Sequence, residues 1–404
     1  MELKEKVEGS ITEWSECWDR MSVQSNKPII KISRIRQIWN YIRIRHITKK
    51  CYKSIDPSLN PEEIMPLLEK DVTKLAQILL GVKKDECASL IQATYASATR
   101  DFIDEARQFD PNMEAESIFQ ALRNVWIMHS IQVLQGQDAK HSPAIFGYSM
   151  LYPLTDNYLD DPSVTKSEKK NFNSLFKRRL QGQGVQCESK ALQDVFSMVE
   201  RMEASYSREV YEVVWESILM IQNAQEKSLN QQGSYDSLTE AYIQKLSFMK
   251  GGTSVLADGY LVCGDLSPQW IHFLLGYGIL LQLADDLQDL YTDAASKHWT
   301  LFSIYYQHKT VDSQVQKLRN FSHEVFKTFP GDWSASNKVL IEVMRKAVDY
   351  LIFDAAIHVQ KSCQRSYLER LEKQFPVNVR QQEKLNLIWK SMTQNIRPNL
   401  ADYK

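Results

Sequence analysis

The chain has 404 residues, of which 43% are hydrophobic and 25% are charged, a balance typical of a folded protein with a sizeable core. Its 49 basic and 50 acidic residues leave a formal net charge of −1, so we expect no nucleic-acid partner. The six cysteines include no C-x-x-C pair, which argues against a disulfide framework or a zinc site. We find no secretory signal and no apolar run of about 18 residues, so we expect a cytoplasmic protein.

Apolar residues recur at spacings of three and four along most of the chain, for example over 64–79 and 340–352, while β-type alternation is scarce. Glycine and proline fall between these periodic segments, as helix punctuation does. None of the breaks is long enough to be an evident interdomain linker. We therefore predict an all-α protein of roughly a dozen helices, with an N-terminal helical extension over 1–60 and a single all-α domain over 61–404.

The segment 31–53 departs from the neutral charge balance, because it carries eight Lys or Arg residues and no acid. Five apolar residues form a stripe along it: Ile32, Ile35, Ile38, Trp39 and Ile42. A basic amphipathic helix of this kind can lie on an anionic membrane surface. It can also pack its isoleucines on the domain and leave its arginines in solvent, and this second interpretation is the one we favour.

The segment SPAIFGYSMLYPLTDNYLDDP (142–162) predicts a helix that starts at Ser142 and Pro143. Its largely apolar run ends in three aspartates: Asp156, Asp160 and Asp161. Asp156 and Asp160 are four residues apart and so share one helix face.

The segment GYGILLQLADDLQDLYTD (276–293) repeats this design. On one helix, a glutamine and four aspartates fall on or beside one face: Gln282, Asp285, Asp286, Asp289 and Asp293. Like charges four residues apart repel each other, and beside buried leucines the cost is larger. A hard cation, Mg²⁺ or Mn²⁺, would compensate these oxygen ligands. The alternative for each cluster is an acidic helix face that emerges into solvent.

Carboxylates on facing helices of a bundle are a known way to build an internal metal site. Magnesium keeps only one or two protein carboxylates and fills its shell with water and substrate phosphate. Two opposed clusters therefore predict several Mg²⁺ ions that hold a diphosphate between them.

The sequence LLQLADDLQDLYTD resembles the second aspartate-rich motif of the trans-prenyl diphosphate synthases, F-Q-x-x-D-D-x-x-D, with Leu281 in place of the phenylalanine. Lys297 follows near the family's post-motif lysine, and KGGTSVLADGY (250–260) is similar to the family's lysine–threonine segment, in which the lysine contacts diphosphate. The resemblance implies a class I terpenoid synthase fold, an all-α bundle around a deep apolar cavity with three Mg²⁺ ions at its mouth.

The first cluster departs from this family, because it reads D-N-Y-L-D-D rather than D-D-x-x-D and is closer to the D-x-x-x-D of squalene-type and phytoene-type synthases and some terpene cyclases. The arginine pair and the upstream G-K-x-x-R-P that bind isopentenyl diphosphate are missing. We therefore expect a Mg²⁺-dependent terpene synthase, a carbon–oxygen lyase that converts one linear prenyl diphosphate, of C15–C20 length, into a terpene hydrocarbon or alcohol plus diphosphate.

The expected site residues follow from this chemistry. The expected metal ligands are Asp156, Asp160, Asp161, Asp285, Asp286 and Asp289. Catalysis would rest on Asp156, Asp160, Asp285, Asp289 and Lys250. Diphosphate binding would involve Lys250, Lys297, Arg178, Arg179, Gln282, Arg365 and Tyr367, although the two adjacent arginines could equally be surface charges. Tyr152 and Tyr148 would form a cavity floor if they point inward, or would be ordinary core residues.

Two other functions stay open at this point. One is a prenyl transferase, either chain-elongating or of the head-to-head, squalene-like kind. The other is a non-catalytic helical protein that binds membrane surfaces through residues 31–53. The expected partners are thus a prenyl diphosphate, a membrane surface contacted peripherally through that segment, and a second copy of the chain in a homodimer.

Overall fold

The computed structural model describes residues 2–24, 31–53, 61–83, 96–161, 163–186, 189–232, 238–306 and 310–396. Within these ranges there are 17 α-helices and no strand, so the predicted all-α class is confirmed. The α-helices are α1 (Leu3–Arg20), α2 (Arg34–Lys53), α3 (Pro61–Leu80), α5 (Ser97–Phe109), α6 (Ala115–Leu134), α7 (Pro143–Asp160), α8 (Lys166–Leu180), α9 (Lys190–Ser205), α10 (Glu212–Ser228), α11 (Glu240–Cys263), α12 (Pro268–Gln288), α13 (Leu290–Ser296), α14 (Leu301–Tyr306), α15 (Asp312–Lys327), α16 (Ala335–His358), α17 (Arg365–Leu371) and α18 (Val379–Ile396).

The helices α7 and α12 begin with the same serine–proline device. Ser142 is the N-cap of α7, where its Oγ accepts a hydrogen bond from the Ile145 N–H at 3.2 Å, so the start predicted there is confirmed. Ser267 caps α12 in the same way, with proline at the first helical position. A serine oxygen satisfies one of the free N–H groups of the first turn, and proline fits there because it has no N–H to satisfy.

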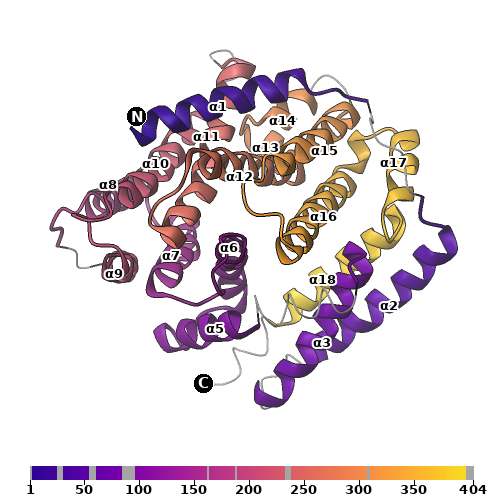
Figure 1. The fold of residues 1–404 in the computed structure, drawn as a ribbon, viewed down its shortest axis with the longest axis horizontal. Coiled ribbons are helices and arrows are strands. Elements are labelled where there is room, and N and C mark those ends of the chain that lie inside the picture. Colours follow the sequence, from indigo (N-terminus) through magenta and orange to yellow (C-terminus); the bar gives the residue numbers. More distant parts are fainter. Residues whose placement is uncertain are drawn as a thin grey trace.

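Helix α6 runs through the middle of the bundle, with α5, α7, α11 and α16 packed around it (Figure 1). Helix α12 packs along α11 and also contacts α15, α16 and α1. One hydrophobic cluster extends through nearly all of these helices. The two segments that end in aspartates therefore belong to one bundle and are separated by α6 and α11.

Glycines allow α11 and α12 to approach each other closely. A Cβ added to Gly278 of α12 would lie 2.1 Å from the backbone oxygen of Gly251 of α11. A Cβ added to Gly251 would lie 2.4 Å from the Cβ of Gln282. Two backbones can cross this tightly only where side chains are absent, and this explains the glycines that follow Lys250.

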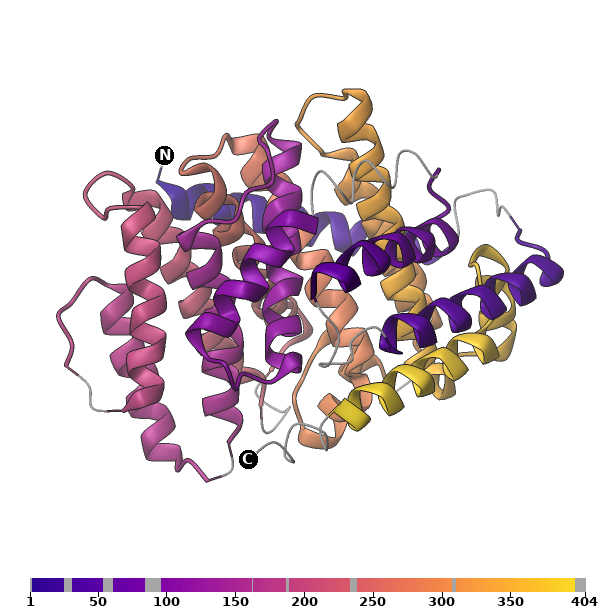
Figure 2. The ribbon, with the colours of Figure 1, turned by 90° about the horizontal axis from the view of Figure 1, so that it is seen from below.

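The two described helices within the first 60 residues, α1 and α2, have different neighbours. Helix α1 is part of the core, because Trp14 and Trp18 are buried and the Trp14 indole donates a hydrogen bond to the backbone oxygen of His272 at 2.9 Å. Helix α2 lies on the opposite side of the molecule, against α3 and α18 (Figures 1 and 2). No helix in the described ranges combines the length and apolar character needed to cross a bilayer.

The packing that we favoured for residues 31–53 is confirmed for the arginines, which are exposed, but is wrong for the apolar stripe. Helix α2 docks on the chain through polar side chains: Gln37 donates hydrogen bonds to the backbone oxygens of Glu372 and Phe375, and Asn40 donates one to that of Pro376. Most of the apolar stripe faces away from the domain, and Trp39 is 63% exposed. The side of α2 that faces the domain instead combines these two polar residues, which satisfy free backbone oxygens before α18, with the buried Ile44 and Ile47.

Candidate functional site

The second aspartate cluster lies at the junction of α12 and α13. The single helix expected over 276–293 divides at Asp289, which is the residue between the two helices. The backbone N–H of Asp289 still donates a hydrogen bond to the backbone oxygen of Asp285, and the backbone N–H of Asp293 donates one to the backbone oxygen of Asp289, both at 2.9 Å. The helical spacing of the carboxylates therefore continues through the junction.

Asp286 is the buried member of this cluster, with 6% of its surface exposed. Gln282 donates a hydrogen bond to its Oδ1 at 2.7 Å, while its buried Oδ2 has no hydrogen-bond partner of normal geometry. Burial, with the charge of Asp285, raises the pKa of Asp286 to about 6, against the lowering effects of Gln282, of the Lys250 charge and of the nearby Ser247 hydroxyl. An acceptor oxygen left without a donor in a buried place costs free energy that a cation would offset.

The other carboxylates of the cluster repel one another. Burial, together with the charges of Asp286, Asp289 and Asp285, raises the pKa of Asp293 to about 7. Desolvation and Asp285 also raise the pKa of Asp289. The Lys250 ammonium lowers the pKa of three of these aspartates. Asp285 and Asp289 are exposed, so the uncompensated negative charge is costly mainly at the buried Asp286 and the partly buried Asp293.

Helix α6 connects the two clusters. The Gln120 amide donates a hydrogen bond to Oδ2 of Asp156 at 3.1 Å. Arg123, three residues later on the same helix, lowers the pKa of Asp289, as His358 at the end of α16 also does. Residues three apart lie on neighbouring positions of a helix surface, so one turn of α6 reaches a carboxylate of each cluster.

A buried polar network lies between α6, α7 and α11. Asn124 donates hydrogen bonds to Oδ1 of Asp258 at 3.0 Å and to Oγ of Ser149 at 3.2 Å. Asp258 is fully buried, and burial raises its pKa well above the ordinary value. Tyr148, a predicted floor residue, lies near this carboxyl, which helps to raise the pKa of its hydroxyl. Tyr152 is half exposed. The deep apolar cavity stays a prediction, and this part of the interior is polar.

The first cluster contains two more predicted metal ligands, Asp160 and Asp161. The side chain of Asp160 lies outside the part of the chain that the structure describes. Asp161 uses its Oδ1 locally, as the acceptor of hydrogen bonds from the N–H and Oγ of Ser163, both at 2.7 Å.

Several predicted diphosphate contacts lie apart from the carboxylates. Arg178 donates to Gln183, and Arg179 forms a bidentate ion pair with Glu203, at 2.7 and 2.5 Å. Both arginines are on α8, which packs against α9 and α10 at the edge of the bundle (Figure 1). They serve the packing of that edge.

The other residues predicted to bind diphosphate, Lys297, Arg365 and Tyr367, differ in their exposure and partners. Lys297 follows α13 as an exposed residue in the left-handed region, with φ of 56°. Arg365 is 93% exposed at its side chain and pairs with Glu369 on its own helix. Tyr367 is buried in α17, where burial raises the pKa of its hydroxyl. Of the predicted basic residues, Lys250 is the one that lowers the pKa of the α12 carboxylates.

The α12 cluster fits a hard divalent cation when phosphate supplies further ligands. Among the described side chains, no three of the ligating types already converge closely enough to hold an ion by themselves. Magnesium in phosphate sites requires only one or two protein carboxylates. The raised pKa values of the buried Asp286 and of its neighbour Asp293 are what closely spaced carboxylates show when no cation balances their charge.

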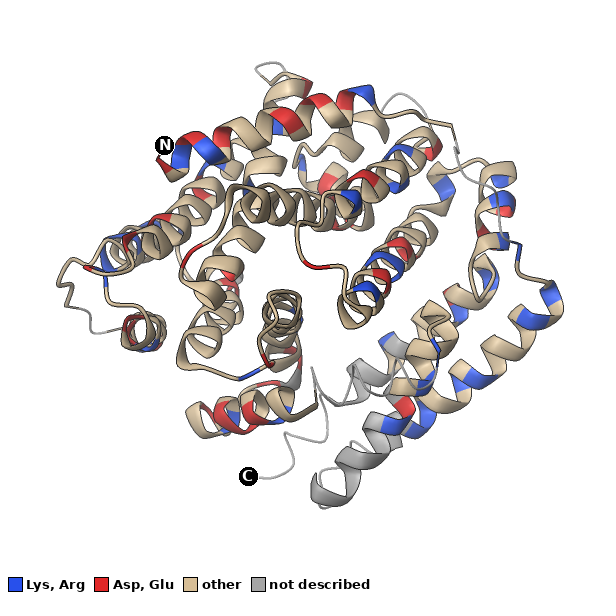
Figure 3. Cartoon of the chain, viewed as in Figure 1, with Lys and Arg blue, Asp and Glu red and all other residues tan. Residues whose placement is uncertain are grey.

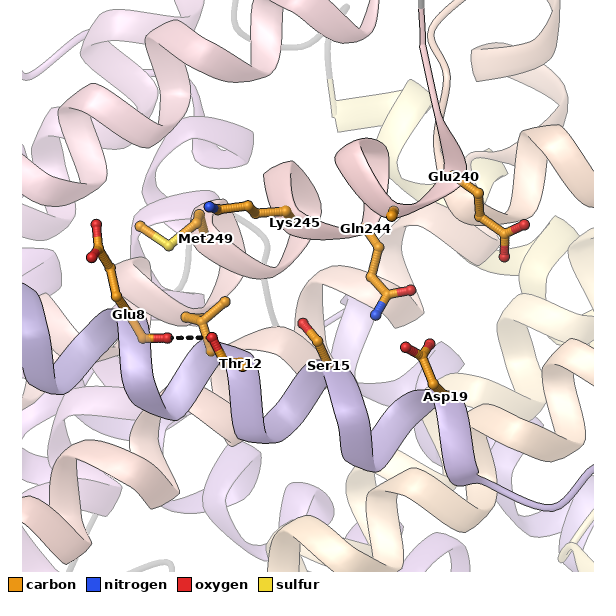
Figure 4. A pocket seen from close by; sticks show the side chains of 10 residues that line it. Glu8, Thr12, Ser15, Asp19, Glu240, Gln244, Lys245 and Met249 are labelled. Atoms are coloured by element: carbon orange, nitrogen blue, oxygen red, sulfur yellow. Dashed lines mark hydrogen bonds between the residues drawn. The ribbon is translucent and has the colours of Figure 1, made fainter.

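Two surface pockets lie elsewhere. One, of about 600 Å³, opens between α1 and α11 and is lined by charged residues that include Glu8, Asp19, Glu240 and Lys245 (Figure 4). The other lies between the ends of α6 and α16, beside Trp270 at the start of α12. Neither is lined by a residue of the two aspartate clusters.

The chain matches no protein-family profile, no curated protein and no solved structure. Sequence reasoning missed Gln120, Arg123 and His358, which reach the clusters from α6 and α16. A polar group at positions 120, 123 and 124 within an apolar helix is the signal that could have drawn attention to α6.

Proposed function

We propose that this chain is a class I terpene synthase that uses Mg²⁺ to ionise one linear prenyl diphosphate. The observation that carries the proposal is the buried carboxylate of Asp286 among the charges of Asp285, Asp289 and Asp293, with Lys250 as the neighbouring cation. Such a group is costly unless its charge is balanced, and divalent cations with a diphosphate balance it.

The second support is the position of α6 between the clusters. Gln120 orients Asp156 through a direct hydrogen bond, and Arg123 adds a positive charge beside Asp289. A diphosphate held between the two clusters would meet this arginine from one side and Lys250 from the other. The side chains of Arg123 and Lys250 would both stabilise the negative charge that develops on the diphosphate as the C–O bond breaks.

When bound, magnesium ions would supply Lewis-acid stabilisation of the diphosphate oxygens. The roles of the protein groups are then distinct. Asp285, Asp286 and Asp289 would hold the ions, and the Gln282 amide would keep Asp286 oriented. Tyr152, one turn before Asp156 and half exposed, would present its ring to the allylic cation, a contact worth about 0.5–2 kcal/mol.

The absence of the isopentenyl diphosphate motifs from the sequence favours this activity over chain elongation. An elongating enzyme must bind a second diphosphate through basic side chains. The nearest candidates, Arg178 and Arg179, are engaged with Gln183 and Glu203 instead.

The test is product analysis. The purified chain is incubated with single prenyl diphosphates of C10 to C25 and Mg²⁺, and the extract is examined by gas chromatography–mass spectrometry. A terpene hydrocarbon or alcohol of unchanged carbon number is expected, with loss of product in Asp286→Asn and full product in Asp138→Asn, an exposed aspartate away from the clusters. A strict requirement for isopentenyl diphosphate, or a product of doubled carbon number, would replace the proposal with a prenyl transferase. No magnesium-dependent release of diphosphate would refute it.

A further inference from the structure

Helix α2 presents a continuous apolar stripe to the outside of the molecule. Four large side chains form it, with exposed fractions of 71% for Ile35, 50% for Ile38, 63% for Trp39 and 50% for Ile42. They belong to the large hydrophobic residues that are exposed in the described chain, and they lie three or four residues apart or adjacent on one face of one helix. Contiguous exposed apolar surface on a folded protein marks an interaction site.

The stripe contributes nothing to the attachment of the helix. Each residue advances about 100° around a helix, which places the stripe opposite the buried side of α2. That buried side carries Gln37, Asn40, Ile44 and Ile47. It docks through the hydrogen bonds that Gln37 and Asn40 donate to the segment before α18 and through the burial of Ile44 and Ile47 in the core. The fold is therefore complete without any burial of the stripe.

Arginines flank the stripe on both sides. By the same helical geometry, Arg34 and Arg45 fall along one edge, and Arg36 and Arg43 fall along the other. All four are exposed. Figure 3 shows α2 with Lys and Arg along its length and no acid, although the whole chain is nearly neutral.

We propose that α2 lies in the headgroup region of an anionic lipid bilayer, with its isoleucines and Trp39 inserted and its arginines on the lipid phosphates. An interfacial helix of this type buries its apolar face at the acyl boundary, and each basic residue near the surface adds attraction to anionic lipid. Tryptophan suits this boundary because its ring is apolar while its N–H can bond to the headgroups.

Charge complementarity selects the bilayer over a second copy of the chain. In a symmetric pairing of two α2 stripes, the flanking arginines of one copy would approach those of the other, and no acid over 31–53 would offset them. A lipid surface instead supplies negative charge on both sides of the inserted stripe. Helix α2 also lies at an edge of the molecule in both views (Figures 1 and 2), where a flat surface can reach it.

The test is sedimentation of the full-length chain with vesicles of phosphatidylcholine alone or with phosphatidylserine added. Binding is expected only with phosphatidylserine and should weaken at high salt. The quadruple variant Ile35→Gln/Ile38→Gln/Trp39→Gln/Ile42→Gln should lose binding. Because these side chains are exposed, it should keep the wild-type helical circular dichroism.

Charge variants give an independent readout. Arg36→Glu/Arg43→Glu should weaken binding at least about tenfold, since each basic residue near the surface contributes about 1 kcal/mol. The matched control Lys166→Glu/Lys170→Glu, on exposed positions of α8, should bind as the wild type does. Equal binding to neutral vesicles, or binding that survives both α2 variants, would overturn the proposal. So would a lack of vesicle binding together with a dimer, seen by light scattering, that the quadruple variant dissociates.

Discussion

Replacing Gly278 with alanine tests the close crossing of α11 and α12, which carries Lys250 to the α12 carboxylates. The added Cβ would lie 2.1 Å from the Gly251 backbone oxygen and 2.8 Å from its carbonyl carbon. Both atoms are backbone inside a helix, so no side chain can rotate away. The helices must separate by at least about 1 Å to restore ordinary contacts.

The expected size of the effect follows from two opposing contributions. Overpacking of this kind costs about 3 kcal/mol, while alanine in place of glycine favours a helix by about 1 kcal/mol. We therefore expect Gly278→Ala to lower the free energy of unfolding by about 2 kcal/mol. The control is Gly9→Ala in α1, where the added Cβ would meet no atom within 4 Å. That variant should be neutral or more stable by up to about 1 kcal/mol.

Urea unfolding followed by circular dichroism measures both variants. The midpoint should fall for Gly278→Ala at an unchanged slope, and it should hold or rise for Gly9→Ala. A Gly278→Ala protein as stable as the wild type would refute the close crossing and, with it, the placement of Lys250 beside Asp286.

Three further predictions concern the charges of the site. Lys250→Met should weaken the binding of inorganic diphosphate in the presence of Mg²⁺ by about tenfold or more, measured by calorimetry, because a charge-assisted contact is lost. Arg123→Gln should weaken the same binding, whereas Arg178→Gln should leave it unchanged; the reverse order would restore the expectation made from sequence. Folding raises the pKa of Asp286 from 3.8 to about 6, so the folded chain binds more protons than the unfolded chain between these values and stability falls as pH rises through this window. Without metal, Asp286 should contribute about 3 kcal/mol to the loss between pH 4 and 7 by urea unfolding, in addition to the share of Asp293, and Asp286→Asn should reduce the loss by about that amount; an unchanged pH dependence in that variant would contradict the assignment.

The sequence was sufficient to predict the helical class and the start of α7, because hydrophobic period and serine–proline caps are local signals. The two aspartate segments could also be recognised locally. Their connection through Gln120 and Arg123 could not, since it depends on how α6 packs against both α7 and α11. The same holds for the division at Asp289 within a segment that reads as one helix.

Two departures have clear physical reasons. Two glycines stand between Lys250 and Thr253, and the structure explains them by the close approach of a second helix at Gly278, 27 residues after Gly251. The stripe on α2 has the period of a core-facing helix, yet the opposite side docks, with Gln37 and Asn40 as donors to backbone oxygens before α18 and with Ile44 and Ile47 buried. Periodicity identifies an apolar face but does not identify what covers it.

The central claim is that the clusters on α7 and α12 hold divalent ions jointly. A double-mutant cycle with Asp156→Asn and Asp286→Asn tests it directly, with Mg²⁺-dependent binding of inorganic diphosphate measured by calorimetry. We expect binding only with Mg²⁺, weakening in each single variant, and a coupling free energy of at least about 1 kcal/mol between the two changes. Additive effects of the two substitutions, or diphosphate binding that persists in EDTA, would contradict a shared site.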